Sequence, residues 1–441
     1  MKPYAARRAA FAEQMGNGVA VIPGARTTLR NRDTEYVFRQ SSDFFYLTGF
    51  DEPDAVLVIA PGHQTHQSIL FTLPHDRSME IWTGRRHGVQ GALGHFGFDA
   101  AYEVSELDAH LPNLISGYET LFYQLGENET FDQRMFAAIR KARQSTRRQG
   151  GLAPATITNP SELLHEMRLI KSAQEIATMR RAGAISRLGH IAGMEATQPG
   201  MHEYELEAVI EFAYHKNGAQ DIAYPSIVAG GANATILHYS TNRDVLRDGD
   251  LVLVDSGCEL DLYASDVTRT WPVNGRFSAE QRAIYEIVLA AQKAGIAAVQ
   301  PGNRYSDSHD AAVQVIVEGL LALRLLTGSR DELIETKRYE DYYYHNTGHW
   351  IGLDVHDVGR YRELSAKTYR TLQAGMTLTV EPGLYIPVDL DCDERFKGIG
   401  VRIEDDVHCT AGGPDVLSAD IPKEIDDVQA IVGRARTVAV S

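Results

Sequence analysis

The sequence predicts an α/β (α+β) protein with a mixed α/β N-terminal domain over residues 1–165 and a second domain, residues 166–441, that is internally duplicated. Three observations support this expectation. The chain has 441 residues, which is longer than one ordinary domain, so two domains are expected. The polar tract RKARQSTRRQGG at residues 140–151 separates two regions of different character. Beyond it, the same order of helices and strands occurs twice.

The first domain mixes short helical patterns with strand-like runs. The opening MKPYAARRAAFAEQM has no apolar core of secretory length, so an amphipathic helix is expected rather than a signal peptide. The apolar runs DAVLVIA, residues 54–60, and SILFTL, residues 68–73, have the length and composition of buried strands. This mixture predicts an α/β domain.

The second domain begins with two helices. Ser172 and Glu175 have the spacing of a capping box, and the helix that they open should end before Gln-Pro-Gly at 198–200. A second helix is expected from about Glu203 to Asn-Gly at 217–218. Strand-like segments follow it.

The rest of this domain repeats that order. Ser278 and Gln281 form another capping box, and their helix should end before a second Gln-Pro-Gly at 300–302. A partner helix and strands follow. The segment GDLVLVDSG at 249–257 has a counterpart in GMTLTVEPG at 375–383, with an acidic residue six positions after the first glycine in both. These matches predict an internal duplication.

The two halves offer the same polar residues in the same order. These are His238, Asp255 and Asp266 in the first half and His356, Glu381 and Glu404 in the second. If the halves pack about a pseudo-twofold axis, both sets converge on one point between the sheets. Carboxylates gathered there would raise each other's pKa values unless a cation lay between them. Two divalent cations would balance the four carboxylates.

The donor types favour particular metals. Paired cations about 3.5 to 4 Å apart, bridged by carboxylates, are an arrangement that activates water for hydrolysis. Oxygen-rich ligation with a histidine fits Mn, Co, Fe or Zn, and the hardness of the oxygen ligands favours Mn²⁺. The segment NTGHWIGLDVHDVG supplies two candidate histidine ligands, His349 and His356. One can bind metal while the other faces substrate.

Composition excludes other classes of protein. The net charge of −16, with 59 acidic and 43 basic residues, argues against a general nucleic-acid binder. Three cysteines are too few for a disulfide framework or a cysteine-rich zinc site and fit a reducing compartment. No apolar run reaches the roughly 18 to 20 residues of a membrane helix. We therefore expect a cytoplasmic protein with neither nucleic-acid nor membrane partners.

Several stretches of the chain resemble a known family. They are ILHYS, DGDLVLVDSGCELDLYASDVTRTWPVNGRFS, GHWIGLDVHDVG, GMTLTVEPGLYI, FKGIGVRIEDDV and, near the N-terminus, RNRDTEYVFRQSSDFFYLTGFDEPDAVLVI. Together they are similar to the pita-bread metallopeptidases, and most similar to aminopeptidase P, over nearly the whole chain. The resemblance implies a pita-bread fold for the second domain and an aminopeptidase-P-like first domain.

The resemblance also implies roles for individual residues. It assigns five metal ligands: Asp255, Asp266, His349, Glu381 and Glu404. They would hold two divalent ions, with Asp266 and Glu404 bridging. It assigns catalytic roles to Glu381, His238, His356 and Arg402. Glu381 would take the proton from the metal-bridging water, and the two histidines would bind substrate carbonyls and the tetrahedral intermediate. Residues at substrate-binding positions are Tyr224, His345, Tyr385 and Trp82.

Other residues have competing interpretations. Asp405 and Asp406, beside Glu404, are expected to be solvated charges at a strand end. Trp82 is either a core residue or, as in the resembling enzymes, an aromatic that projects from a neighbouring subunit toward the active site. In the same enzymes the first domain packs in homo-oligomers, so a dimer or tetramer is expected, with this domain restricting access to substrate.

The resulting functional hypothesis is an aminopeptidase that removes the N-terminal residue from peptides with proline second. A prolidase, which cleaves Xaa-Pro dipeptides, uses the same metals, and Arg395 and Lys397 keep that alternative open because a prolidase must bind a free carboxylate. The pita-bread fold also hosts metal-free amidinohydrolases and binding proteins. Such relatives typically lose the carboxylate cage, which is intact here.

Overall fold

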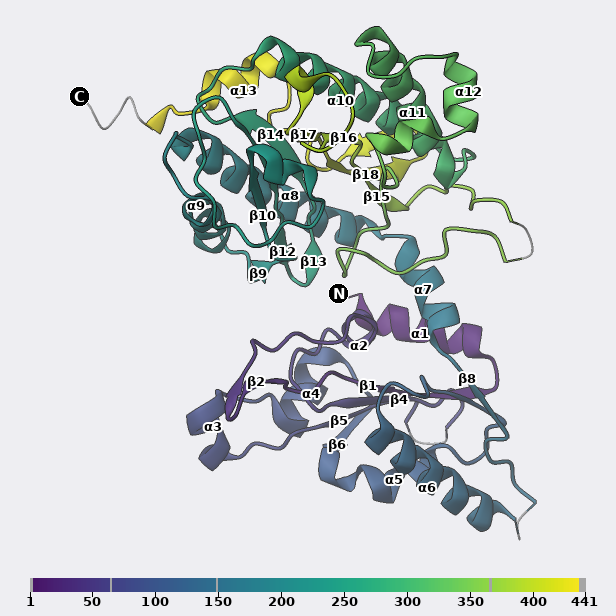
Figure 1. Ribbon diagram of the computed structural model, residues 1–441. Helices are drawn as coiled ribbons and strands as arrows, with labels where there is room; N and C mark the ends of the chain where they lie inside the picture. Colours follow the sequence, from purple (N-terminus) through teal and green to yellow (C-terminus); the bar gives the residue numbers. More distant parts are fainter. Residues whose placement is uncertain (1–2, 64–65, 148–149, 365–366, 436–441) are drawn as a thin grey trace. The chain divides into compact units, whose positions relative to one another are not determined.

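The protein is described from a computed structural model, in residues 3–63, 66–147, 150–364 and 367–435 (Figure 1). The first two residues of the predicted opening helix and residues 148–149 of the polar tract lie outside this description. The chain forms two compact units, Met1–Met167 and Arg168–Ser441, called here the N-terminal and C-terminal units. Within the described residues, no helix is long and apolar enough to cross a lipid bilayer.

The N-terminal unit is built on a six-stranded mixed sheet of order β6-β5-β4-β1-β7-β8. Its strands are β1 (Gly18–Pro23), β4 (Val56–Ile59), β5 (Ser68–Thr72), β6 (Ala100–Glu103), β7 (Thr120–Phe122) and β8 (Thr156–Thr158). The two predicted apolar runs are confirmed as β4 and β5. They are antiparallel neighbours and bury alternate side chains such as Val58 and Phe71.

Helices lie on both faces of this sheet. The helices of the unit are α1 (Tyr4–Met15), α2 (Ser42–Thr48), α3 (Arg77–Thr83), α4 (Gly88–Phe96), α5 (Leu107–Leu114) and α6 (Glu129–Thr146), and α7 (Ser161–Leu169) crosses the boundary between the two units. Figure 1 shows α5 and α6 on one face of the sheet and α1 and α2 on the other. A short hairpin, β2 (Leu29–Asn31) and β3 (Thr34–Glu35), stands apart from the sheet.

The first half of the C-terminal unit begins with the helix pair α8 (Ala173–Ala196) and α9 (Glu203–Lys216). The capping box is confirmed, because Glu175 Oε2 accepts from the Ser172 N–H at 2.8 Å and Ser172 Oγ accepts from the Glu175 N–H at 3.4 Å. The strands that follow are β9 (Asp221–Ile222), β10 (Ile227–Gly230), β11 (Leu251–Asp255), β12 (Cys258–Leu260), β13 (Tyr263–Ala264) and β14 (Thr268–Pro272). Of these, β10, β11 and β14 form one antiparallel sheet.

The second half opens with a confirmed capping box at Ser278 and Gln281. Its helices are α10 (Ala279–Ala297), α11 (Tyr305–Ala322) and α12 (Arg330–Glu335), with α13 (Ile425–Ile431) near the end of the chain. Its strands are β15 (Thr377–Val380), β16 (Gly383–Ile386), β17 (Ile399–Arg402), β18 (Asp405–Thr410) and β19 (Gly413–Val416). Strands β15, β18 and β19 form the second antiparallel sheet.

The predicted duplication is confirmed by the order of these elements. In the first half, hairpin β12–β13 lies in the chain between the paired strands β11 and β14. In the second half, hairpin β16–β17 lies between the paired strands β15 and β18. Figure 1 shows the strands of both halves between the helix pairs α8–α9 and α10–α11. Equivalent strand ends of the two halves therefore meet in the middle of the unit.

Candidate metal centre

The five predicted ligands lie at equivalent positions in the two halves. Asp255 is the last residue of β11, and Glu381 directly follows β15. Asp266 lies just before β14, and Glu404 directly precedes β18. His349 lies on the irregular segment beside β15, where its carbonyl accepts from the Thr379 N–H at 2.9 Å. The strand ends thus deliver carboxylates from both halves to one place.

Three of these residues can contact a single ion. Asp266, His349 and Glu404 each offer one ligand atom, and these atoms lie within 4.8 Å of one another. His349 Nε2 is 3.3 Å from Asp266 Oδ2 and 3.7 Å from Glu381 Oε1. The Tyr224 hydroxyl lies 2.6 Å from Asp255 Oδ1 and 2.5 Å from Asp266 Oδ1, and so connects Asp255 to the same cluster.

The orientation of His349 suits a metal ligand. Its Nδ1 donates to the backbone carbonyl of Trp350 at 3.0 Å, which leaves the Nε2 lone pair facing the carboxylates. Burial alone would lower the pKa of His349, but the hydrogen bond to Asp266 and the charge of Glu381 raise it to about 9. With this pKa, His349 holds a proton at neutral pH that balances the charge of the carboxylates. A bound cation would replace that proton.

The carboxylates are poorly stabilised without a cation. Burial and the neighbouring carboxylates raise the pKa of Glu404 well above its ordinary value and that of Glu381 to about 7. Burial also raises the pKa of Asp255, although Arg402 opposes this. Burial acts against Asp266 too, yet its contacts with His349 and Tyr224 lower its pKa. This donor set fits divalent cations.

Arg402 holds one of these carboxylates. Its Nη2 lies 2.6 Å from Asp255 Oδ2, its Nη1 donates to the Tyr385 hydroxyl at 3.2 Å, and its Nε donates to Thr268 Oγ1 at 3.1 Å. The side chain is buried, so these contacts occupy most of its donors. His345 Nε2 lies 2.8 Å from the same Tyr385 hydroxyl. Arg402, Tyr385 and His345 therefore form one connected group.

A cavity of about 570 Å³ opens onto the cluster. All five predicted ligands line it, together with Arg402, Tyr224, His238, His345 and His356. Burial, assisted by Arg402, lowers the pKa of His345 to about 3, and burial with the nearby His349 lowers that of His356. Both imidazoles are therefore neutral at pH 7. An apolar part of the wall is formed by Pro225, Ile227, Leu237 and Val355.

Two threonines that were not predicted as site residues contact the predicted ligands. Thr268 Oγ1 donates to Glu404 Oε2 at 2.6 Å. Thr379 Oγ1 accepts from the His349 N–H at 3.0 Å and donates to Glu381 Oε1 at 3.3 Å. Each is two positions from a predicted ligand, so the alternation of side chains along a strand could have indicated both.

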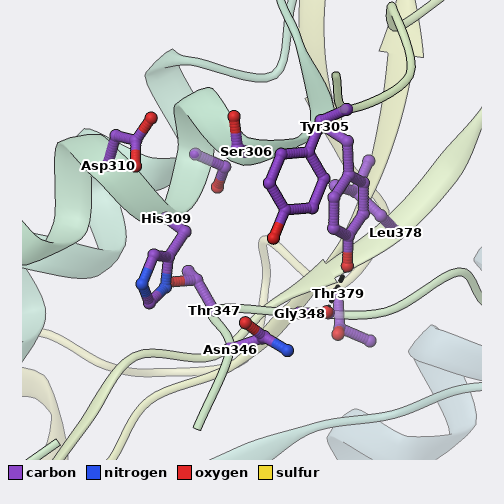
Figure 2. Close-up of a pocket in the computed structure, with 11 residues that line it drawn as sticks. Tyr305, Ser306, His309, Asp310, Asn346, Thr347, Gly348, Leu378 and Thr379 are labelled. Atoms are coloured by element: carbon purple, nitrogen blue, oxygen red, sulfur yellow. Dashed lines mark hydrogen bonds between the residues drawn. The ribbon is translucent and has the colours of Figure 1, made fainter. Parts of the chain in front are cut away.

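A smaller cavity of about 70 Å³ borders residues 346–348, the segment that leads to His349 (Figure 2). Figure 2 shows Tyr305, His309 and Thr347 around it. Tyr305 donates to the carbonyl of Gly348, and His309 Nδ1 lies 3.0 Å from Thr347 Oγ1. This cavity is too small for a peptide, and its walls support the segment that positions His349.

The prediction for Asp405 and Asp406 is wrong. Both side chains are fully buried on β18, at 0% and 1% exposure. Asp405 pairs with Arg269 at 2.8 Å and with Lys423 at 2.5 Å. Asp406 Oδ2 accepts from the N–H of Asp266 at 3.1 Å. These partners come from distant parts of the chain, which is why the local pattern suggested solvated charges.

The core interpretation of Trp82 is also wrong. The residue lies on α3 and is 84% exposed, as is its neighbour Ile81 at 73%. Among the described residues, it does not line the 570 Å³ cavity. The interpretation as an intersubunit aromatic stays a prediction.

This fold and donor set define a metal-dependent peptidase, and comparison with known proteins identifies the group. Residues 177–411 match metallopeptidase family M24, and residues 4–123 match the N-terminal domain of aminopeptidase P. The chain belongs to family M24. The predicted pita-bread fold is thereby confirmed.

Individual relatives are similar over nearly the full length. The Xaa-Pro aminopeptidase of Escherichia coli (strain K12) is 43% identical over 432 residues, covering 98% of this chain and 97% of the relative. The structure of an aminopeptidase from Pseudomonas aeruginosa is 46% identical with a TM-score of 0.95 and 98% coverage of both chains. A zinc-substituted E. coli aminopeptidase P in complex with product is 42% identical with a TM-score of 0.94, again with 98% coverage of both.

Proposed function

We propose that the protein is an Xaa-Pro aminopeptidase, which hydrolyses the bond between an N-terminal residue and a following proline. One observation carries this proposal: four carboxylates and a histidine from two duplicated halves line one cavity. Relatives that cover nearly the whole chain and bear this name support the choice of substrate.

The metal centre would hold two divalent ions. We assign Asp255, Asp266, His349, Glu381 and Glu404 as the residues that would hold these ions. Mn²⁺ suits the oxygen-rich set, while zinc, cobalt and iron also fit. Bound divalent cations lower the pKa of water and polarise carbonyl oxygens.

The chain's own residues would supply the remaining chemistry. Glu381 lines the cavity at the end of β15, and its carboxylate is placed to accept a proton from water there. His238 and His356 line the same cavity and can donate hydrogen bonds to the substrate carbonyl as negative charge develops on its oxygen. Arg402 would keep Asp255 in place, and Tyr224, His345 and Tyr385 would orient the groups around the substrate.

The cavity also suits the ends of the substrate. The acidic cluster attracts the free ammonium group of a peptide N-terminus. The apolar wall formed by Pro225, Ile227, Leu237 and Val355 can contact a proline ring. Both features favour a short unblocked peptide with proline second.

The N-terminal unit would restrict access to the cavity and build a homo-oligomer. Apolar side chains are exposed on α3 and in and after the β2–β3 hairpin: Leu29, Tyr36, Val37, Met79, Ile81 and Trp82. Contiguous exposed apolar patches commonly mark protein contacts, and Met79, Ile81 and Trp82 lie together on the one helix α3. Three free cysteines fit our further proposal that the protein works in the cytoplasm.

The test combines metal removal with a choice of peptides. Protein dialysed against a chelator should lose activity, and Mn²⁺ should restore it. Xaa-Pro-Yaa peptides should be cleaved faster than Xaa-Pro dipeptides and Xaa-Ala-Yaa peptides. Full activity without metal would refute the proposal, and a preference for dipeptides would indicate a prolidase. Arg395 and Lys397, which motivated that alternative, instead pair with Asp393 and Glu394.

A further inference from the structure

His238 and His356, the two cavity-lining histidines assigned to the substrate carbonyl, lie on irregular segments. His238 lies between the 3₁₀ turn Gly231–Thr235 and β11, and His356 follows the segment that carries His349. Both side chains are exposed, and although the His356 ring packs edge-on against His349 with centroids 4.3 Å apart, burial holds neither side chain. Strand hydrogen bonds do not fix them either. Something else must hold each segment in place.

For His238, the support is the buried carboxylate of Glu203, the first residue of α9. This side chain is 0% exposed. Its Oε1 accepts from the Gly230 N–H at 2.8 Å and from Asn233 Nδ2 at 3.0 Å. Its Oε2 accepts from the Tyr239 hydroxyl at 2.9 Å and from the Asp244 N–H at 2.8 Å. One carboxylate thus binds both ends of residues 230–244 and the neighbour of His238.

For His356, the support is the next residue, Asp357, whose side chain is 1% exposed. Its Oδ2 lies 2.9 Å from Lys171 Nζ, and its Oδ1 lies 2.5 Å from Arg168 Nη2. The same Arg168 nitrogen is 2.7 Å from Asp354. The Asp357 N–H donates to the carbonyl of Trp350 at 2.8 Å.

The packing around Asp357 leaves little freedom. A Cβ atom on Gly352 would lie 2.2 Å from Asp357 Oδ2, so the backbone of this segment closes tightly over the carboxylate. Lys171 is also tied to the second half through its N–H, which donates to the Gly375 carbonyl at 2.8 Å. The carboxylate therefore fixes the backbone directly beside His356.

We propose that Glu203 and Asp357 are a matched pair of positioning residues, each holding the loop that presents one cavity-facing histidine. This inference rests on the proposed function, since it assigns the histidines a role in hydrolysis. Neither carboxylate lines the cavity, so neither touches substrate. Misplacement of a catalytic group by about 1 Å can cost on the order of 10²-fold in rate.

Double-mutant cycles test whether Glu203 acts through His238 and Asp357 acts through His356. Glu203→Gln and Asp357→Asn keep the shape of the side chain but remove its charge and part of its accepting capacity. Each should lower kcat/KM by about 10- to 100-fold, with metal content unchanged. Glu203→Gln should have little further effect in a His238→Ala background but its full effect in a His356→Ala background. Asp357→Asn should show the opposite pattern, so each cycle is the control for the other.

Asp132→Asn is a control for the loss of a buried carboxylate. Asp132 accepts from the Tyr123 hydroxyl at 2.6 Å within the N-terminal unit. This variant should lower the melting temperature without changing kcat/KM. Milder variants, Tyr239→Phe for Glu203 and Lys171→Gln for Asp357, serve if the first pair fails to fold. These variants should show the same dependence on the histidine background, with smaller decreases in kcat/KM.

Backbone hydrogen exchange gives a readout independent of activity. Glu203→Gln should speed exchange in residues 230–244 and leave residues 350–357 unchanged, while Asp357→Asn should do the reverse. The proposal would be overturned if Glu203→Gln or Asp357→Asn lowered kcat/KM by the same factor in the His238→Ala and the His356→Ala backgrounds. Unchanged hydrogen exchange in the targeted loop would overturn it as well. A wild-type protein inactive on Xaa-Pro peptides would refute the proposed function instead, and the exchange pattern would still test the positioning.

Discussion

Arg402 and Asp255 form an ion pair of 2.6 Å that joins the two halves of the C-terminal unit beside the predicted metal ligands. Asp255 ends β11 in the first half, and Arg402 ends β17 in the second. In the absence of a cation, Arg402 and the protonated His349 are the positive charges in contact with this buried group of carboxylates. Arg402 therefore shares the task of charge compensation with the metal.

Arg402→Met should destabilise the metal-free protein more than the metal-loaded protein. Removing one partner of a buried ion pair typically costs about 3 to 5 kcal/mol, because the other charge is left uncompensated. Bound cations would supply part of that compensation. Denaturant unfolding with and without Mn²⁺ measures the difference, and an equal loss in both forms would contradict the assignment.

Glu381→Gln should abolish most activity while preserving the fold. The change keeps the shape of the side chain but removes the proton acceptor, and loss of a general base typically lowers kcat by about 10²- to 10⁴-fold. The kinetics should be measured at saturating Mn²⁺ with metal content determined on the same sample. Unchanged kcat would place the base elsewhere.

Metal binding should release protons at neutral pH. Without a cation, the pKa of Glu381 is about 7 and that of His349 about 9, so both groups hold protons that a metal must displace. The affinity for Mn²⁺ should therefore rise with pH up to about 9. Calorimetry in buffers of different ionisation enthalpy counts the protons, and Glu381→Gln should release fewer. Affinity that does not vary between pH 6 and 9 would exclude these shifts.

The same pKa shifts determine how the stability of the metal-free protein changes with pH. The pKa of Glu381 is raised from 4.5 to about 7, so the folded state binds more protons than the unfolded state in this range. The contribution of Glu381 to the free energy of unfolding is therefore lost as pH rises from about 4.5 to 7. That of His349, raised from 6.5 to about 9, is lost over the next two to three pH units. Both losses should disappear when metal is bound.

Trp82→Ala should alter kinetics without lowering the melting temperature. A surface substitution usually changes stability by less than about 0.5 kcal/mol, whereas a core tryptophan would cost about 3 to 5 kcal/mol. If Trp82 reaches substrate in a neighbouring subunit, KM should rise with metal content unchanged. Leu125→Ala, at another exposed apolar position of the same unit, is the control. Normal KM and an unchanged oligomer would refute this role.

Local signals in the sequence were sufficient for many elements of the fold. The capping boxes at Ser172 and Ser278 begin α8 and α10, because each depends on residues only three positions apart. The duplication was visible because strand ends with acidic residues recur at the same spacing. These features are encoded within short windows of the chain.

Features that depend on contacts between residues far apart in the chain could not be predicted from the sequence. Asp405 is buried because Arg269 and Lys423 neutralise it, and Arg269 lies on a strand of the other half. Likewise, Glu203 was expected only to begin a helix, and its four hydrogen bonds to residues 230–244 depend on the fold of that loop. The exposure of Trp82 could not be predicted either, because its neighbours Ile81 and Met79 are apolar residues that would be expected in a core but are exposed on α3.

The distribution of the predicted ligands over both halves has a consequence for synthesis of the protein. Asp255 and Asp266 emerge from the ribosome long before Glu404, which precedes the last sheet strands of the chain. At roughly 5 to 20 residues per second, this interval is on the order of 10 s. During it the ligand set remains incomplete. A metal centre shared in this way can be loaded only after nearly the whole chain has been translated, so no truncated nascent chain can act as a peptidase.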